Sequence, residues 1–274
     1  MSKEARLLLL PSLGVRFTRS ILAICYGGLP IRVNRAHSLS LKADKTMFTV
    51  SSPHRTTSLT AGILYLITFV SIPTLSIYGA VKSANYVLGA GPDTAAIIGG
   101  ISEIVVALAG IGTAVALFPM LKKQNESLAL GLVAARILES GTIFVGVAFL
   151  LSIVSLRQAG AGSEALATSH ALVALYDRIF LLGQSFMPAI CDLLLGYMLY
   201  QSRLVPRALS LIGIVGAPVL LAGYFAVMFG VFGQHDALPG MSAIFVALFE
   251  FSLGIWLIVR GFNPSAVASL DARN

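Results

Sequence analysis

Long apolar runs constrain this chain more than any other feature of its sequence. They alternate with short polar connections from residue 58 to residue 260. Each run is close to or longer than the roughly 20 residues that an α-helix needs to cross a bilayer, and none alternates apolar and polar residues as a barrel strand does. We predict an all-α fold, a polytopic membrane bundle of six transmembrane helices over residues 59–81, 95–120, 128–154, 170–200, 209–232 and 242–260. The fourth of these helices spans either over its full length or only over residues 180–200.

The composition excludes a water-soluble globule. Charged residues make up 11% of the chain and hydrophobic residues 57%, whereas a soluble domain carries about 25% charged residues. A lipid bilayer is therefore the predicted surrounding of most of the chain. The net charge of +7 does not indicate nucleic-acid binding, because residues 1–46 hold eight Lys or Arg and two acids, which leaves +1 for residues 47–274.

Residues 1–57 differ from the rest of the chain, since they are basic, rich in serine and poor in acids. We interpret them as a leader that is disordered or absent from the native protein, whose start would then be Met47. A targeting segment and a basic tail on anionic lipid are the alternatives. The predicted transmembrane domain covers residues 58–262, and residues 263–274 form a short cytoplasmic tail.

The basic residues of the short connections predict the orientation, because cytoplasmic loops carry an excess of Lys and Arg. An even number of helices places both termini on one side. That side holds Arg55, Lys122, Lys123, Arg203, Arg207, Arg260 and Arg273, while the other side holds Lys82 and Arg157. We therefore predict that both termini are cytoplasmic.

Seven ionisable side chains fall inside the predicted helices, where charges are costly and usually face the bundle interior. They are Glu103, Arg136, Glu139, Asp177, Arg178, Asp192 and Glu250. At 1.5 Å per residue, Arg136 and Asp192 lie at one depth, about 12 Å from the cytoplasmic side, and are predicted to pair. Glu103, Arg178 and Glu250 are expected to form a second layer nearer the outer side, and Glu139 lies one helical turn from Arg136.

These seven residues are the candidate site, a buried polar network. The simplest interpretation is that they are satisfied ion pairs that fix the helix register. However, five acids face only two bases, so some carboxyl groups must carry a proton, contact water or bind a cation. Such carboxyl groups are what proton-coupled transport or acid sensing requires.

Recognisable catalytic motifs are missing from the sequence. It holds no phosphate-binding loop, no His-Glu-x-x-His and no Gly-x-Ser-x-Gly. His170 and the pair His235 and Asp236 could meet a metal ion near the outer face, but two histidines without defined spacing are more often interface residues. We therefore predict no catalytic residue, no metal site and no cofactor.

Small residues predict helix contacts, because lipid gives no hydrophobic drive for association. Ala222, Ala226 and Gly230 form a ridge on the fifth predicted helix. Contacts within one bundle are the first interpretation of this ridge. A second copy of the chain or another membrane protein is the alternative partner.

Three segments resemble the bacterial multi-pass membrane family catalogued as domain of unknown function 4386. They are residues 60–66 (TAGILYL), 203–213 (RLVPRALSLIG) and 249–262 (FEFSLGIWLIVRGF). The likeness covers about residues 55–263. It implies a bundle of six or a similar number of helices in the cytoplasmic membrane of a bacterium, and it supplies no activity and no ligand residue.

Three functions remain open at this point. The leading prediction is transport or sensing of a small molecule or ion through the buried carboxylates, which a water-accessible carboxylate in a cavity would favour. A structural or regulatory bundle without turnover would have a dry, fully paired interior. A lipid-modifying intramembrane enzyme would have a polar pocket that opens sideways to lipid; enzymatic activity is not the favoured prediction.

Overall fold

The computed structural model describes residues 53–234 and 236–273. The chain divides into two compact units, residues 1–49 and 50–274, and the fold below belongs to the second. Met47, the predicted native start, lies outside the described residues, and so do Cys25 and His235. Most of the predicted leader falls there as well.

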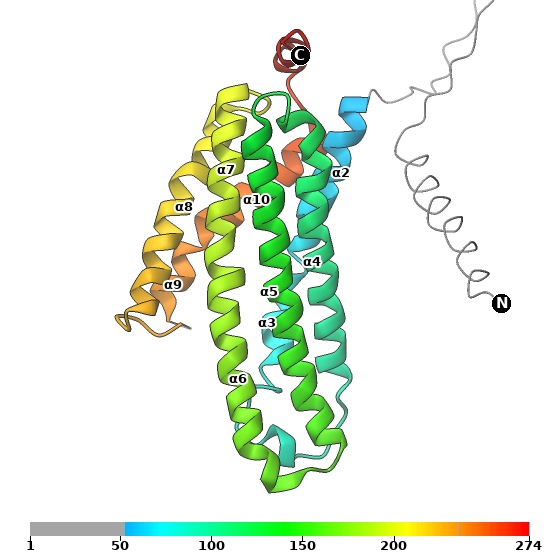
Figure 1. The fold of residues 1–274 in the computed structure, drawn as a ribbon, viewed down its shortest axis with the longest axis vertical. Coiled ribbons are helices and arrows are strands. Elements are labelled where there is room, and N and C mark those ends of the chain that lie inside the picture. Colours follow the sequence, from blue (N-terminus) through cyan, green and yellow to red (C-terminus); the bar gives the residue numbers. More distant parts are fainter. Residues whose placement is uncertain (1–52, 235, 274) are drawn as a thin grey trace, which may run out of the picture. The chain divides into compact units, whose positions relative to one another are not determined.

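The described residues contain helices and no strand, which confirms the predicted fold class (Figure 1). Within the part of the chain that the structure describes, six segments are long and apolar enough to cross a membrane, as predicted. They are Pro53–Tyr78, Thr94–Leu121, Glu126–Gln158, Gly162–Ser202, Arg207–Met228 and Ala237–Val259. In chain order, the elements are α2 (Pro53–Thr68), α3 (Ser71–Tyr78), η1 (Tyr86–Leu88), α4 (Thr94–Leu121), α5 (Glu126–Gln158), η2 (Gly162–Ala165), α6 (Leu166–Phe180), η3 (Leu181–Phe186), α7 (Met187–Ser202), α8 (Arg207–Met228), α9 (Ala237–Ser242), α10 (Ile244–Val259) and α11 (Pro264–Asp271).

The first span begins at Pro53 and not at residue 59, so residues 53–57 belong to a helix rather than to the predicted leader. The span is interrupted between α2 and α3. Pro73 lies in the first turn of α3, where its missing N–H leaves no helical hydrogen bond unmade. The proline therefore follows the interruption, at a position that the start of a helix tolerates.

The connection that the predicted helices leave between them, residues 155–169, is much shorter in the structure. Helix α5 continues to Gln158 and the fourth span begins at Gly162, which leaves three residues between them. Gly160 and Gly162 make this tight turn with φ angles of 67° and 59°, a region that glycine enters without steric cost. Apolar residues on α5 and α6 stabilise the extension, because Leu150, Ile153 and Tyr176 are buried together there.

The six spans pack in a closed ring. Helix α2 contacts α4, α4 contacts α5, α5 contacts α7, α7 contacts α8, α8 contacts α10, and α10 returns to α2. The closing contact is made backbone to backbone, since a Cβ added to Gly62 would lie 2.7 Å from the carbonyl oxygen of Gly254. Small residues permit such close approach between membrane helices.

Small residues on other helices behave in two ways. Gly110 and Gly213 are buried between helices, and a Cβ at Gly213 would lie 2.8 Å from the Phe249 ring. The predicted ridge does not form one packed face, because Ala222 is exposed, Ala226 is half-buried and Gly230 is exposed beyond the end of α8. The prediction of contacts within one bundle is therefore wrong for Ala222 and Gly230.

A π-helical turn, η3, interrupts the fourth span immediately before α7. Pro188 explains its position, because a proline ring clashes with the carbonyl four residues earlier in an α-helix, here that of Gln184. The wider π turn relieves this clash and rotates the residues before the proline. Such turns are frequent at functional sites.

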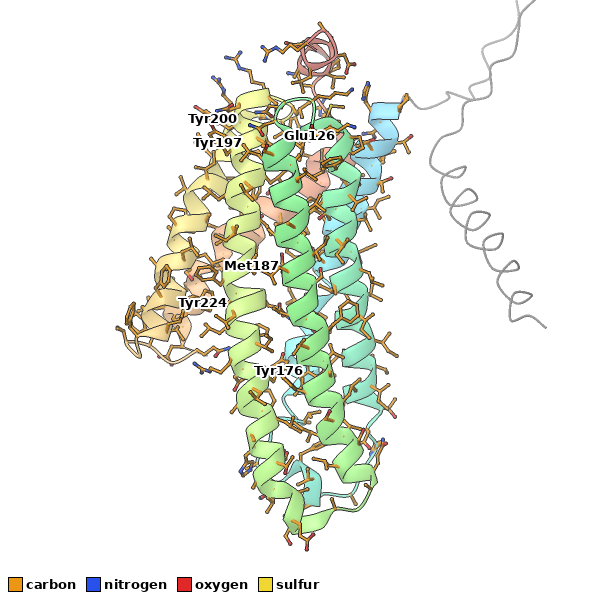
Figure 2. All side chains as sticks on the ribbon, in the orientation of Figure 1. Glu126, Tyr176, Met187, Tyr197, Tyr200 and Tyr224 are labelled. Atoms are coloured by element: carbon orange, nitrogen blue, oxygen red, sulfur yellow. The ribbon has the colours of Figure 1, made fainter. Side chains whose placement is uncertain are left out.

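Aromatic residues mark the ends of the spans. Tyr197 and Tyr200 lie in the last turns of α7, close to the start of α5 at Glu126 (Figure 2). Tyrosine at such positions matches the aromatic belts of membrane proteins. Tyr176 lies on the other side of Met187, well inside the same span, and it is buried in the core instead (Figure 2).

Candidate functional site in the membrane-spanning core

Four ionisable side chains from three helices meet inside the ring. Arg136 and Glu139 come from α5, Asp192 from α7 and Glu250 from α10. Arg136 is only 3% exposed, and its Nη1 donates to both carboxylate oxygens of Glu139, at 3.3 and 3.1 Å. Its Nη2 donates to Oε1 of Glu250. The guanidinium therefore joins α5 to α10 across the ring.

Asp192 is in contact with this group but is bonded less well. It is fully buried, and its Oδ1 lies 3.8 Å from Nη2 of Arg136. Neither of its carboxylate oxygens has a hydrogen-bond partner among the described residues. The expected contact between Arg136 and Asp192 is present at ion-pair distance, while the hydrogen bonds of the guanidinium go to the two glutamates.

Two further side chains lie beside this group. The Tyr65 ring of α2 lies with its centroid 5.7 Å from Cζ of Arg136, within reach of a cation–π interaction. The thiol of Cys191 donates to Oε2 of Glu139 at 3.4 Å. Neither neighbour brings a positive charge, so one guanidinium faces three carboxyl groups.

A cavity of about 230 Å³ adjoins the cluster and reaches Arg136, Glu139 and Glu250. A water molecule takes about 30 Å³ in the liquid, and sites for drug-sized ligands are about 300–1,000 Å³. The space therefore suits a few water molecules or a very small solute. The Ser185 hydroxyl lines the cavity and is buried without a hydrogen-bond partner among the described residues.

Glu103 on α4 is a separate buried carboxyl group and is 3% exposed. It accepts hydrogen bonds from the Thr74 hydroxyl of α3 and from Nε2 of Gln184, the latter at 3.0 Å. No Lys or Arg of the described residues forms an ion pair with it. Gln184 also lines the cavity, so this one side chain lies between Glu103 and the Arg136 cluster.

The second layer predicted from Glu103, Arg178 and Glu250 is wrong. Its basis was a sixth span that begins at residue 242, whereas the span begins at Ala237. Glu250 is thus nine residues from the end of α10 at Val259, or about 14 Å at 1.5 Å per residue. This depth is close to that of Arg136, and the two side chains pair.

Asp177 and Arg178 do not join the buried cluster. Asp177 pairs with Lys82, whose Nζ lies 2.6 Å from its Oδ1. Arg178 is exposed, and its Nη2 donates to Gln234 at 3.4 Å. Because Gln234 belongs to the connection between α8 and α9, both residues lie at the level where the fifth span ends.

Sequence reasoning missed Gln184, Ser185 and Thr74. Gln184 and Ser185 are adjacent polar residues in an apolar run, shortly before Pro188. A polar pair in front of a helix-interrupting proline was the available signal. Thr74 gave none, because a lone threonine in a membrane helix commonly bonds its own backbone.

The geometry of this site is accompanied by one family match. Residues 60–261 match the family described as domain of unknown function DUF4386, and this range covers more than half of the chain. The chain therefore belongs to that family, in agreement with the resemblance of its sequence segments. No curated protein and no solved structure matches the chain.

Proposed function

We propose that this member of the DUF4386 family transports or senses protons through the carboxyl groups that surround Arg136. The observation that carries the proposal is the convergence of three carboxyl groups on one guanidinium beside a cavity. Transport or sensing of a small molecule or ion is the broader class to which this function belongs.

The charge of the cluster supports the proposal. Arg136 balances one of the three carboxylates, and burying an uncompensated charge costs several kcal/mol or more. A proton on one of the carboxyl groups removes most of that cost. A metal cation suits the site less well, because it would lie beside the positive guanidinium. A proton that exchanges through the cavity changes the charge that holds α5 to α10, so its uptake is coupled to helix packing.

Gln184 extends the polar surroundings toward a second carboxyl group. It lines the cavity and donates to Glu103, which lies between α3, α4 and the π turn. Protons that reach the cavity are therefore one side chain away from another acceptor. A relay between Glu103 and the Arg136 cluster is the arrangement that we propose for transport.

A structural bundle without turnover is supported less well, because its interior should be dry and fully paired. Asp192 and Ser185 instead have buried oxygens without hydrogen-bond partners among the described residues. Lipid modification is the second candidate, favoured by one observation. Ile72, which lines the cavity, is 60% exposed on the lipid-facing side of α3, so the cavity is near the acyl chains.

Reconstituted protein tests the proposal. In liposomes that hold a pH-sensitive dye, an imposed pH gradient should collapse faster with the native chain than with Glu250→Gln. Glu126→Gln is the matched control, because Glu126 is exposed at the start of α5. The single tryptophan, Trp256, lies on α10 with Glu250 and reports a sensor, since its fluorescence should change with pH only while Glu250 is present. If neither signal depends on Glu250, the proposal fails, and lipid turnover becomes the function to assay.

We also propose that both termini face the cytoplasm of a bacterial cell. The support is the excess of Lys and Arg at the end of the spans where α2 begins and α10 ends. A reporter enzyme that is active only outside the cytoplasmic membrane should be inactive when fused to the C-terminus and active when inserted after Gly160. The opposite pattern would reverse the orientation.

A further inference from the structure

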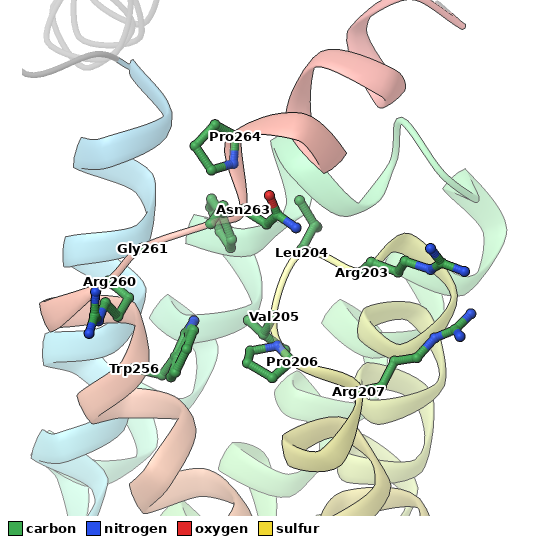
Figure 3. Close-up of a pocket in the computed structure, with 11 residues that line it drawn as sticks. Arg203, Leu204, Val205, Pro206, Arg207, Trp256, Arg260, Gly261, Asn263 and Pro264 are labelled. Atoms are coloured by element: carbon green, nitrogen blue, oxygen red, sulfur yellow. The ribbon is translucent and has the colours of Figure 1, made fainter.

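A groove lies at the basic end of the spans, where the connection between α7 and α8 faces the link from α10 to α11 (Figure 3). Its volume is about 560 Å³. Figure 3 shows Trp256 and Pro206 beside each other in the groove, with Arg260 on one flank and Arg203 and Arg207 on the other. The apolar side chains of its lining are Leu204, Val205, Pro206, Trp256, Phe262 and Pro264.

A polar pocket of about 450 Å³ adjoins this groove and shares Arg203, Arg207 and Asn263 with it. Arg273 adds a third guanidinium to the pocket. Its hydroxyl groups come from Ser202, Ser265 and Ser269. None of the described acidic side chains lines the groove or the pocket, so the described lining of the combined site is strongly positive.

The backbone at Arg203 is unusual. Its φ of 57° makes it the non-glycine residue with a positive φ among the described residues, and it ends α7 in the left-handed conformation where glycine is normally found. Arg203 forms no ion pair within the described chain. The guanidinium of Arg207 lies 4.9 Å from the centre of the Tyr200 ring, which holds it beside the pocket.

We propose that the pocket and the groove together bind one anionic phospholipid. Its phosphate would lie among Arg203, Arg207 and Arg273, and its glycerol and the start of its acyl chains would lie along the apolar groove. The site is amphipathic and lies where α7 and α10 end and α8 begins, the depth of lipid headgroups. A soluble phosphate would leave the groove empty, and a zwitterionic headgroup would bring its cation to three guanidinium groups. This binding is independent of the proposed proton function.

Binding of short-chain lipids to the full chain in detergent tests the proposal. Native mass spectrometry or a titration should show dioctanoyl phosphatidylglycerol binding more tightly than dioctanoyl phosphatidylcholine. Each Lys or Arg near anionic lipid contributes about 1 kcal/mol, which is about a fivefold change in affinity. Arg203→Gly and Arg207→Gln should each weaken phosphatidylglycerol binding about fivefold, and the double variant about 30-fold if the two contributions add.

Two control measurements distinguish binding at this site from a general effect of positive charge and from a loss of binding through misfolding. Lys122→Gln removes a positive charge from the same end without touching either cavity, and it should leave the affinity unchanged. Arg203→Gly also suits the positive φ, so the thermal stability of this variant should not fall. A loss of binding in this variant is then a loss of the cation and not of the fold.

Three results would overturn the proposal. Equal binding of the two lipids would show that the site does not select an anionic headgroup. An equal loss in Lys122→Gln and Arg203→Gly would assign the effect to the overall charge of this end. Competition by glycerol 3-phosphate at the concentrations at which phosphatidylglycerol binds would identify a soluble phosphate ester as the occupant instead.

Discussion

Removing different members of the Arg136 cluster should have very different consequences for stability. Arg136 donates two hydrogen bonds to Glu139 and one to Glu250, and breaking a buried charged pair costs about 3–5 kcal/mol. Arg136→Gln should therefore lower the free energy of unfolding by about that amount. Neither carboxylate oxygen of Asp192 has a hydrogen-bond partner among the described residues, and its ion-pair contact is the 3.8 Å approach to Arg136. That contact is worth about 4 kcal/mol at an effective dielectric constant of 20, and desolvation of the carboxylate costs several kcal/mol.

The attraction of Asp192 to Arg136 and the desolvation cost of its carboxylate nearly cancel. Repulsion from the carboxylates of Glu139 and Glu250 further weakens the attraction. Asp192→Asn should therefore change stability by less than about 1 kcal/mol or increase it. Unfolding of both variants in mixed micelles, followed by helical circular dichroism, gives the comparison. A cost for Asp192→Asn equal to that of Arg136→Gln would refute the argument, because it would mean that Asp192 is a fully satisfied partner.

Two further predictions concern the π turn and the connection between α3 and α4. A Cβ at Gly183 would lie 1.8 Å from Oγ1 of Thr142, so Gly183→Ala should cost about 1–3 kcal/mol, and Thr142→Ala should restore part of the loss. Gly141→Ala, with no atom within 4 Å of the added Cβ, should cost nothing in the same unfolding assay, and equal effects would contradict the packing argument. The hydrogen bond from Tyr86, together with a second from Gln158 and the nearby Arg157 guanidinium, lowers the pKa of Asp93 below its ordinary value. The ionised Asp93 carboxylate therefore contributes to stability above about pH 3.9, and this contribution is lost as the pH falls through the lowered pKa. Hydrogen exchange of residues 79–93 should show this loss in the native chain and not in Asp93→Asn.

The spans could be predicted from the sequence because hydrophobic length is a local property. A run such as residues 95–120 must cross the bilayer whatever surrounds it, since backbone groups in lipid need the internal hydrogen bonds of a helix. The contact between Arg136 and Glu139 could also be expected, because residues three apart share a helix face. These features need no knowledge of how the helices are placed around one another.

The partners of the other charges could not be predicted in this way. The depth predicted for Glu250 is wrong because residues 237–241 (ALPGM), which include the helix-disfavouring Pro239 and Gly240, belong to the sixth span. Gln184 turns toward Glu103 because the π turn before Pro188 changes the rotation of the helix. A one-residue shift in the hydrogen-bond pattern of a helix changes the face on which a side chain lies. The apolar pattern of the sequence does not predict where such a shift occurs. Asp177 bonds to Lys82, a residue of the connection after α3 whose position depends on the tertiary fold.

The central claim is that the carboxyl groups around Arg136 hold an exchangeable proton within the membrane. Infrared difference spectroscopy of the reconstituted protein measures this directly, since a protonated carboxyl group has its own C=O stretching band. The account predicts such a band at neutral pH, a shift of the band in deuterated water, and its loss or displacement in Glu250→Gln but not in Glu126→Gln. A spectrum without a protonated carboxyl band at neutral pH, or with a band that both variants leave unchanged, would contradict it.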